Sequence, residues 1–591
     1  MLERIEHAHL FLLPLEGSGQ WYRYHALFAE AMQHEARHRL GVDTVRKLSS
    51  KASSWYEQHA FLNEAIESAL AAEETERAAA LMTRFIEAQD FNQITEFQTL
   101  RRWIQCLPEE MLRRFATLSQ TSAMLLLFGT NQQMPGLRSQ LEYYLQLAES
   151  NLLATENKSR LGEVLALRAL AAGRWNEFDV VQRYAEQALK LLDTHETFWR
   201  SSCLLGVGGA KLLAGRLNEA RPFIQQARAI VEVTGNSYAL RAALFILGQI
   251  SLGEGKLHHA SELFRHILET AGDDRSDRGL ALAGLAALSY EWNELEAAEQ
   301  EALEAYTLSR DLDNELLLVL AAPILARVWQ ALGQTAQALD LLQRLPAHLT
   351  QPGWLREIAT YQARLAFAAD DLASVERWAV SRQATSSEEA LPEAELEREA
   401  LLLARLLLTQ GQTDEALDLL EHWRLQAQSQ SRTRSELEIL LLTAQAYASE
   451  RRLREAKQTL REVLALAYPS GYQRLFLDEG KPLAFLLKSV LIEMRGKSLA
   501  TYLRALLRAF TREQREVGSL NPVLPEPLSP QERRVLRLVV AGRSNLEIAH
   551  ELVVSINTVK AQVKSVYRKL DVHNRLEASE VVRQLRLLSF P

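Results

Sequence analysis

The sequence is poor in cysteine, glycine and proline. Its 591 residues include only two cysteines, Cys106 and Cys203, which are too few for a disulfide framework or a four-thiolate metal site. Its 26 Gly and 15 Pro make up about 7% of the chain, against roughly 12% in average proteins. Because turn-forming residues are scarce, long helices are favoured over a many-stranded sheet, and we predict an all-α fold.

Long apolar runs are also missing. No stretch approaches the roughly 18 uncharged apolar residues that a membrane-spanning helix needs. The N-terminal apolar run, 10–15, is broken by Pro14 and preceded by Glu3 and Glu6, unlike the core of a signal peptide. We therefore expect no membrane segment and a cytoplasmic location.

A two-part motif recurs through the middle of the chain, in which a turn residue is followed five positions later by a small residue in most copies. Its copies begin at Gly173, Gly215, Gly255, Asn293, Gly333, Asp370, Gly411 and Arg451. Apolar residues at helical spacing flank these turns, so each unit is predicted to be a pair of helices. Stacked pairs bury a continuous core. The expected architecture over 51–515 is an α-solenoid similar to tetratricopeptide repeats (TPR), with a period near 40.

Such a solenoid offers an extended surface to ligands or partner proteins. We expect it to receive a small-molecule or protein signal. Trp175, Tyr290 and Trp292 could line that surface, although aromatic residues near helix ends more often serve packing.

A proline-rich linker is predicted over 516–527, because Pro522, Pro525 and Pro527 exclude regular helix. The chain as a whole has a formal charge of −8, yet residues 528–591 carry 11 Lys and Arg against 6 Asp and Glu. The positive charge is therefore concentrated in the last tenth of the chain, where the helix-turn-helix described next predicts contact with double-stranded DNA.

Capping residues mark the helix starts of this basic segment, at Ser529, Ser544, Ser555 and Asn574. Only residues 553–555 separate the second and third predicted helices, which is typical of a helix-turn-helix spanning Asn545 to Lys564. The apolar residues predicted to seat the third helix are Val559, Val563, Val566 and Leu570. They should pack against Val535, Leu536, Val539, Ile548, Ala549 and Leu552.

The opposite side of the third helix and its amino end are the candidate DNA-contact surface. Lysine and arginine can reach guanine or phosphate, a small alanine permits close approach, and polar side chains at a helix N-terminus suit phosphate oxygens. The candidate contact residues are Ser544, Asn545, Ser555, Asn557, Thr558, Val559, Lys560, Ala561, Lys564 and Arg568.

Residues 528–532, 542–549, 555–560 and 569–570 closely resemble the LuxR-type DNA-binding domain, which we expect over 528–591. The resemblance implies that Lys560, Ala561 and Lys564 face bases, and that Asn557 to Val559 lie along the DNA backbone. Many members of that family carry His where this chain has Gln562.

The N-terminus resembles a second family. Residues 2–15, 21–25 and 27–28 are similar to the end of the winged-helix region in MalT-like regulators, which belong to the STAND class of signalling ATPases. Residues 1–50 are therefore expected to be a remnant of that region. Members of the family place an ATPase before it, a helical sensor after it and a LuxR-type domain last.

The sequence lacks the ATPase signature of that family. A Walker A loop needs Gly, four residues, and then Gly-Lys-Ser/Thr. Gly496, Lys497 and Ser498 come closest, but Leu491 occupies the position of the first Gly. We expect no nucleotide or other cofactor in this chain, which implies either a truncated gene start or the loss of ATP-driven control.

One motif has the spacing of a zinc peptidase. His34, Glu35 and His38 match the pattern in which two histidines hold zinc and the glutamate activates water. Thr44 occupies the third ligand position of the longer form of this pattern, and only 33 residues precede the motif. We favour a solvated helix face and expect neither a metal site nor a catalytic site.

The leading hypothesis is a sequence-specific DNA-binding transcription regulator rather than an enzyme. We expect it to pair with a second copy of itself and to contact RNA polymerase. Two alternatives are a protein-interaction scaffold localised to DNA by its helix-turn-helix module, and a zinc peptidase.

Overall fold

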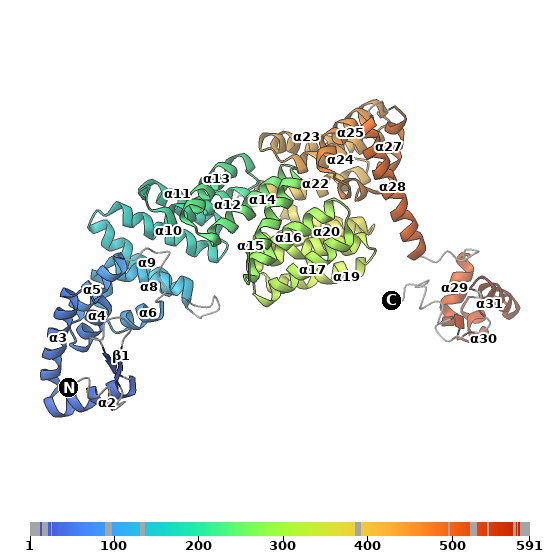
Figure 1. Cartoon of the computed structure of the whole chain (residues 1–591). Helices are drawn as coiled ribbons and strands as arrows, with labels where there is room; N and C mark the ends of the chain where they lie inside the picture. Colours follow the sequence, from blue (N-terminus) through green and yellow to red (C-terminus); the bar gives the residue numbers. More distant parts are fainter. Residues whose placement is uncertain are drawn as a thin grey trace. The chain divides into compact units, whose positions relative to one another are not determined.

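The computed structural model describes residues 12–14, 22–24, 26–88, 97–129, 136–384, 392–493, 497–520, 529–540, 543–552, 554–570, 572, 575 and 577–578. Helices dominate these residues, which confirms the predicted fold class, and Figure 1 follows their order. One short antiparallel pair was not predicted. Strands β1 (Leu12–Pro14) and β2 (Tyr22–Tyr24) pair Leu12 with Tyr24 and Pro14 with Tyr22.

The chain divides into two compact units. Unit 1 comprises Met1–Ser251, Glu262–Ala281 and Pro392–Ala394, and unit 2 comprises Leu252–Ser261, Leu282–Leu391 and Glu395–Pro591.

The helices that precede the predicted repeats belong to unit 1. They are α2 (Ala26–Leu40), α3 (Val42–Gln58), α4 (Leu62–Ala71), α5 (Thr75–Glu87), α6 (Phe97–Gln105), α7 (Glu109–Arg114), α8 (Ala116–Gly129) and α9 (Leu137–Ala154). Their core is built around Trp103, whose indole lies edge-on to Phe85 with ring centroids 5.5 Å apart. The indole Nε1 of Trp103 donates to Glu67 at 2.7 Å, so its polar atom is satisfied within the fold.

Eight helical pairs follow, as the repeated motif predicts. They are α10 (Lys158–Arg174) with α11 (Phe178–Leu191), α12 (Thr197–Leu213) with α13 (Leu217–Thr234), α14 (Ser237–Gly253) with α15 (Leu257–Thr270), α16 (Arg275–Glu291) with α17 (Leu295–Asp311), α18 (Glu315–Ala331) with α19 (Thr335–Arg344), α20 (Pro352–Ala368) with α21 (Leu372–Ala384), α22 (Glu393–Thr409) with α23 (Thr413–Ser429), and α24 (Thr433–Ser449) with α25 (Leu453–Ala467). Short 3-10 turns, η2 (Leu345–His348) and η3 (Tyr468–Ser470), follow α19 and α25.

Seven of the eight predicted turn positions adopt the left-handed backbone conformation. Their φ angles lie between 62° at Asn293 and Arg451 and 81° at Gly215. Five residues later stands an alanine, or Val375 in one pair, that is completely buried. The left-handed residue ends the first helix, and the small residue lets the second helix approach closely.

The first copy of the motif was placed three residues too early. Gly173 lies inside α10, and Asn176 takes the left-handed conformation with φ of 57°. Asparagine tolerates this conformation better than most residues, so the turn does not need the glycine. The buried small residue of this pair is accordingly Val181 rather than Phe178.

Three helices close the repeat region: α26 (Arg474–Leu477), α27 (Gly480–Glu493) and α28 (Lys497–Leu520). Lys497 and Ser498 of the Walker-like triplet begin α28, and Gly496 lies outside the described residues. Helix α28 continues through 516–520 of the expected linker, where no proline interrupts it, and residues 521–528 lie outside the described residues.

The zinc-peptidase motif lies on α2, where His34 and His38 are exposed and Glu35 forms an ion pair with Arg39. Across the described part of the chain, no cluster of three or more His, Cys, Asp or Glu could hold a metal ion. In the same part of the chain, no helix combines the length and the apolar character needed to cross a bilayer.

Candidate nucleic-acid interface

Three short helices carry the predicted DNA-contact residues: α29 (Pro530–Val540), α30 (Asn545–Glu551) and α31 (Ile556–Leu570). Capping boxes begin the first two helices. The backbone N–H of Ser529 donates to Glu532 at 2.7 Å, and that of Ser544 donates to Glu547 at the same distance. Each serine Oγ accepts in return from the glutamate N–H. Both predicted caps are therefore confirmed.

Helix α31 also begins as predicted. The backbone N–H of Thr558 donates to Ser555 Oγ at 3.1 Å, and the two hydroxyl groups lie 2.7 Å apart. Asn574, the fourth predicted cap, lies outside the described residues. The cap at Ser555 fixes where the exposed face of α31 starts, immediately after Val554, and leaves the positive end of the helix facing solvent.

One face of α31 is anchored in a small apolar core. Val559 is completely buried, and Val563 and Val566 are 9% and 1% exposed. Val559 and Val563 share a cluster with Val535, Val539, Ile548 and Ala549, and Leu552 packs at its edge. Leu536 is also completely buried. This seating agrees with the predicted apolar spacing of the helix, although nothing is described of the side chain of Leu570.

Val559 belongs to this core and not to the contact surface. The sequence placed it in both sets, but its side chain has no exposed surface and its backbone N–H donates to Ser555 O at 3.1 Å. Neither the side chain nor the amide is available to a nucleic acid. The correction follows from the helical period, because position 559 lies one turn before Val563 on the seated side.

The opposite side of α31 is exposed and cationic. Lys560, Ala561, Lys564 and Arg568 are all exposed, as are Asn557 and Thr558 nearer the amino end. Within the part of the chain that the structure describes, the ammonium groups of Lys560 and Lys564 form no ion pair and no hydrogen bond. Ammonium groups that stay solvated can exchange water for a phosphate or a base acceptor without breaking an internal contact.

The two candidate residues at the start of α30 are arranged differently. Ser544 is exposed, but its Oγ already accepts from the Glu547 N–H, and Asn545 is half-buried. Hydrogen bonding of Glu547 to Ser544 lowers the pKa of that carboxyl group. The geometry of Ser544 is therefore fixed by its capping role.

A clamp between α29 and α31 was not predicted. Glu532 accepts from Lys569 Nζ at 2.8 Å, from Ser565 Oγ at 2.7 Å and from the Ser529 N–H. Donation from Lys569, aided by the Ser529 amide, lowers the pKa of Glu532 to about 2. The cap was visible in the sequence as Ser-x-x-Glu, but its link to Lys569 depends on helix packing.

A second link joins the same two helices. Gln562 Nε2, at the position where LuxR-type domains often have His, donates to Gln531 Oε1 at 3.3 Å. Gln562 is half-buried, and this bond directs its amide toward α29.

The comparisons with known proteins agree with this arrangement. Residues 162–493 match the family described as the MalT-like TPR region, which is more than half of the chain. The chain belongs to the MalT-like family. Residues 526–582 match bacterial regulatory proteins of the luxR family, and residues 1–43 match the MalT winged helix domain.

Curated relatives match along almost the whole MalT-like chain. The HTH-type transcriptional regulator MalT of Vibrio cholerae serotype O1 is 26% identical over 99% of this chain, and that of Serratia proteamaculans is 25% identical over 99%. In both cases the match covers 66% of the relative, so the chain spans about two thirds of the length of these proteins.

Two solved structures also align with the chain. The APC/C hetero-tetramer Cut9-Hcn1 aligns over 82% of this chain and 99% of its own at 13% identity, with a TM-score of 0.39. The STAND protein PH0952 from Pyrococcus horikoshii, which has a tetratricopeptide repeat sensor, aligns over 76% and 71% at 12% identity, with a TM-score of 0.32.

The aromatic residues considered for the solenoid surface are engaged in packing and internal hydrogen bonds. Tyr290 is 3% exposed and its hydroxyl group lies 3.0 Å from both carboxylate oxygens of Asp478. Trp292 Nε1 donates to Ser470 O at 3.0 Å. Trp175 packs against the apolar core of unit 1 beneath the Arg138 guanidinium.

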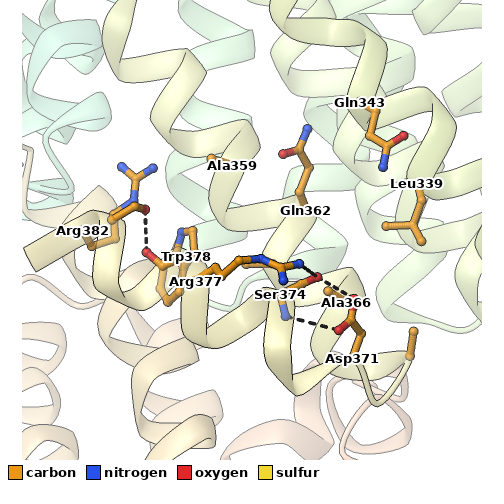
Figure 2. Close-up of a pocket in the computed structure, with 13 residues that line it drawn as sticks. Leu339, Gln343, Ala359, Gln362, Ala366, Asp371, Ser374, Arg377, Trp378 and Arg382 are labelled. Carbon is orange, nitrogen blue, oxygen red and sulfur yellow. Dashed lines mark hydrogen bonds between the residues drawn. The ribbon is translucent and has the colours of Figure 1, made fainter.

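The solenoid also contains a pocket of about 420 Å³ among α19, α20 and α21 (Figure 2). Residues that line it include Leu339, Gln343, Ala359, Gln362, Ala363, Arg377 and Trp378. Arg377 Nη2 donates to Ser374 Oγ at 2.9 Å, so one wall of the pocket is a fixed polar group. The alanines of α20 supply an apolar wall, and this combination is typical of small-molecule sites.

Proposed function

We propose that this chain is a DNA-binding transcription regulator in which α31 reads the major groove and the helical repeats sense a signal. The observation that carries the proposal is the two-sided character of α31. One side is locked into an apolar core by Val559 and Val563, and the other presents solvated lysines. The match to the luxR family of regulatory proteins supports the same function.

The proposed contacts divide by chemistry. Lys560, Ala561 and Lys564 face the bases, because they lie on the side of α31 opposite its core. Ser555, Asn557 and Thr558 at the positive end of the helix meet phosphate oxygens. Arg568 lies one turn after Lys564 on α31, and Ser544 and Asn545 at the start of α30 complete the proposed contact set.

Selection of duplexes from a random pool by the full chain tests this function. We expect a defined sequence to be enriched and to bind in preference to an unrelated duplex of equal length at the same salt concentration. Equal affinity for the two duplexes would contradict sequence-specific recognition.

The finer parts of the proposal concern partners. We propose that the chain acts in the cytoplasm, binds its site paired with a second copy, and contacts RNA polymerase there. The length and symmetry of the enriched sequence test this pairing, because two bound chains require two half-sites about one helical turn apart. A single asymmetric site bound by one chain would argue against pairing.

For the signal, the pocket beside Trp378 is the proposed small-molecule site. Its apolar wall and fixed polar groups support this assignment. The variant Ala359→Phe places a large ring into the pocket. It should abolish the response of DNA binding to an inducer found by screening, while DNA affinity without inducer stays unchanged. A response that survives this substitution would favour a protein signal that docks elsewhere.

A further inference from the structure

A row of polar side chains lies at one register position of four successive helical pairs in unit 2. Six residues before each left-handed turn stand Arg327 in α18, Arg364 in α20, Arg405 in α22 and Gln445 in α24. We call these four residues the ladder. A residue type that recurs at the same position of stacked repeats forms a continuous stripe, because each pair repeats the geometry of its neighbour.

The ladder is occupied by a segment from the end of the repeats. Asp478 accepts from Arg327 Nη2 at 3.1 Å, and Glu479 accepts from Gln445 Nε2 at 3.0 Å and from Arg405. Between them, Glu438 of α24 accepts from Arg405 at 2.8 Å and forms an ion pair with Arg364 at 3.0 Å. Two carboxylates of one short segment thus engage three of the four ladder residues.

Further contacts fix the backbone of this segment, 468–479, across a large sequence distance. The Gln473 N–H donates to Glu291 O at 2.8 Å, and Ser470 O accepts from Trp292. Tyr472 and Phe476 have no exposed surface. The segment is therefore held by polar contacts at its edges and by buried rings between them.

The same segment also holds α28. Arg474, which is 5% exposed, forms ion pairs with Asp478 and with Glu513 of α28, and the Tyr502 hydroxyl of α28 donates to Tyr472 O. In the sequence, α28 is the last helix before the DNA-binding helices. Movement of residues 468–479 would break these contacts between the segment and α28.

We propose that residues 468–479 are an intramolecular latch that occupies a surface built to bind a carboxylate-bearing chain segment, and that they open with α28 as one unit. Opening the latch exposes the ladder and frees the helix that leads to the DNA-binding module. The regulatory part of this proposal rests on the proposed function. The latch itself does not, because its opening can be measured without DNA.

Hydrogen–deuterium exchange of the full chain tests the latch with a matched pair of variants. Glu479→Gln removes a buried carboxylate that binds two ladder residues, whereas Glu493→Gln makes the same change at an exposed carboxylate paired with Lys457 and Arg461. In Glu479→Gln, exchange of 468–479 and of α28 should rise at least tenfold together, while α18 and α22 change less than twofold. Glu493→Gln should leave all four regions within twofold of the unmodified chain.

Three results would overturn the latch. Residues 468–479 could exchange only together with α18 and α22, which would make them an ordinary part of the core. Glu479→Gln and Glu493→Gln could change the exchange of these regions by the same factor. Finally, α28 could stay protected from exchange when residues 468–479 open. If Glu479→Gln fails to fold, hydrogen–deuterium exchange of the unmodified chain in low denaturant tests the latch instead. A latch opens before the repeats unfold, so residues 468–479 and α28 should exchange before α18 and α22.

DNA affinity provides the second readout. Glu479→Gln should shift the affinity of the full chain for its selected duplex at least threefold, and Glu493→Gln should not. Equal affinities of both variants would overturn the regulatory role of the latch. The latch itself would still be tested by the hydrogen–deuterium exchange result. A chain that binds no duplex in any form would instead refute the proposed function.

Discussion

The cations of α31 and those of the ladder are the same kind of group in opposite surroundings. Lys560 and Lys564 are exposed and make no ion pair within the described residues, whereas Arg405 is 7% exposed in its side chain and binds two glutamates. Burying a charge is costly unless it is paired, so the ladder arginines need their carboxylate partners and serve the stability of the fold. The solvated lysines contribute little to stability and are available to a partner.

This contrast separates cations that hold the structure from cations that act on another molecule. Both regions are rich in Lys and Arg, so charge alone does not distinguish them. The pairing and burial of each side chain do. Substitutions in the two regions should therefore change different measurements.

The largest effect is expected at Glu438, a carboxylate bound by two ladder arginines. Glu438 is 1% exposed and binds Arg364, Arg405 and Arg434. Burial alone would raise the pKa of Glu438, but these three arginines outweigh it and hold the pKa well below its ordinary value. Glu438→Ala leaves the buried Arg405 and the half-buried Arg364 and Arg434 short of a partner. It should lower the free energy of unfolding by about 3–5 kcal/mol, measured by urea denaturation. A loss near zero would show that the network is solvated.

On α31, the double change Lys560→Ala and Lys564→Ala should leave the melting temperature unchanged, because both side chains are exposed. Specific DNA binding should weaken by about 1–3 kcal/mol for each base-specific interaction that the change removes. The control is Arg534→Ala with Arg537→Ala, which removes two exposed positive charges from α29. Fluorescence anisotropy at fixed salt measures both. If the control loses as much affinity, general charge and not the face of α31 carries the binding.

A smaller effect on stability is expected at Glu532, which pairs with Lys569 in the clamp between α29 and α31. The pKa of Glu532 is lowered to about 2, so the folded state favours the ionised carboxylate. Its contribution, on the order of 1–2 kcal/mol, is complete above the ordinary glutamate pKa and is lost as pH falls from about 4.5 toward 2. Glu532→Gln should remove this part of the acid dependence of unfolding in the DNA-binding module. An unchanged pH profile would argue that the carboxylate is not paired in solution.

The smallest effect is expected where a charge is paired but exposed. Glu493 pairs with Lys457 and Arg461, and its side chain is 44% exposed. Glu493→Gln should change the free energy of unfolding by about 0–1 kcal/mol, because solvent screens such pairs. A loss of unfolding free energy comparable to that of Glu438→Ala would contradict the claim that burial decides how much an ion pair contributes to stability.

Local features of this molecule could be predicted from its sequence. The turns were predictable because a left-handed residue followed by a buried small one leaves a readable pattern, as at Gly215 and Ala220. The caps at Ser529 and Ser544 were visible because a capping box spans only four residues. The turn predicted at Gly173 was wrong because glycine can also lie within a helix, and Asn176 adopts the left-handed turn conformation instead.

Long-range pairings were not predictable. Asp478 meets Arg327 across 151 positions, and Glu532 meets Lys569 across 37. Such partners depend on how helices stack, which local patterns do not specify. One signal was present: Arg327, Arg364 and Arg405 share a register position, and a search for polar residues at one phase of the repeat would have found them.

The central claim is that the lysines of α31 discriminate between DNA sequences. Its most direct test is the ratio of affinities for the selected duplex and for an unrelated duplex, measured for the full chain and for the variant lacking Lys560 and Lys564. We predict that this ratio falls at least tenfold in the variant while its melting temperature is kept. A ratio that stays the same would contradict the assignment of these lysines to sequence recognition.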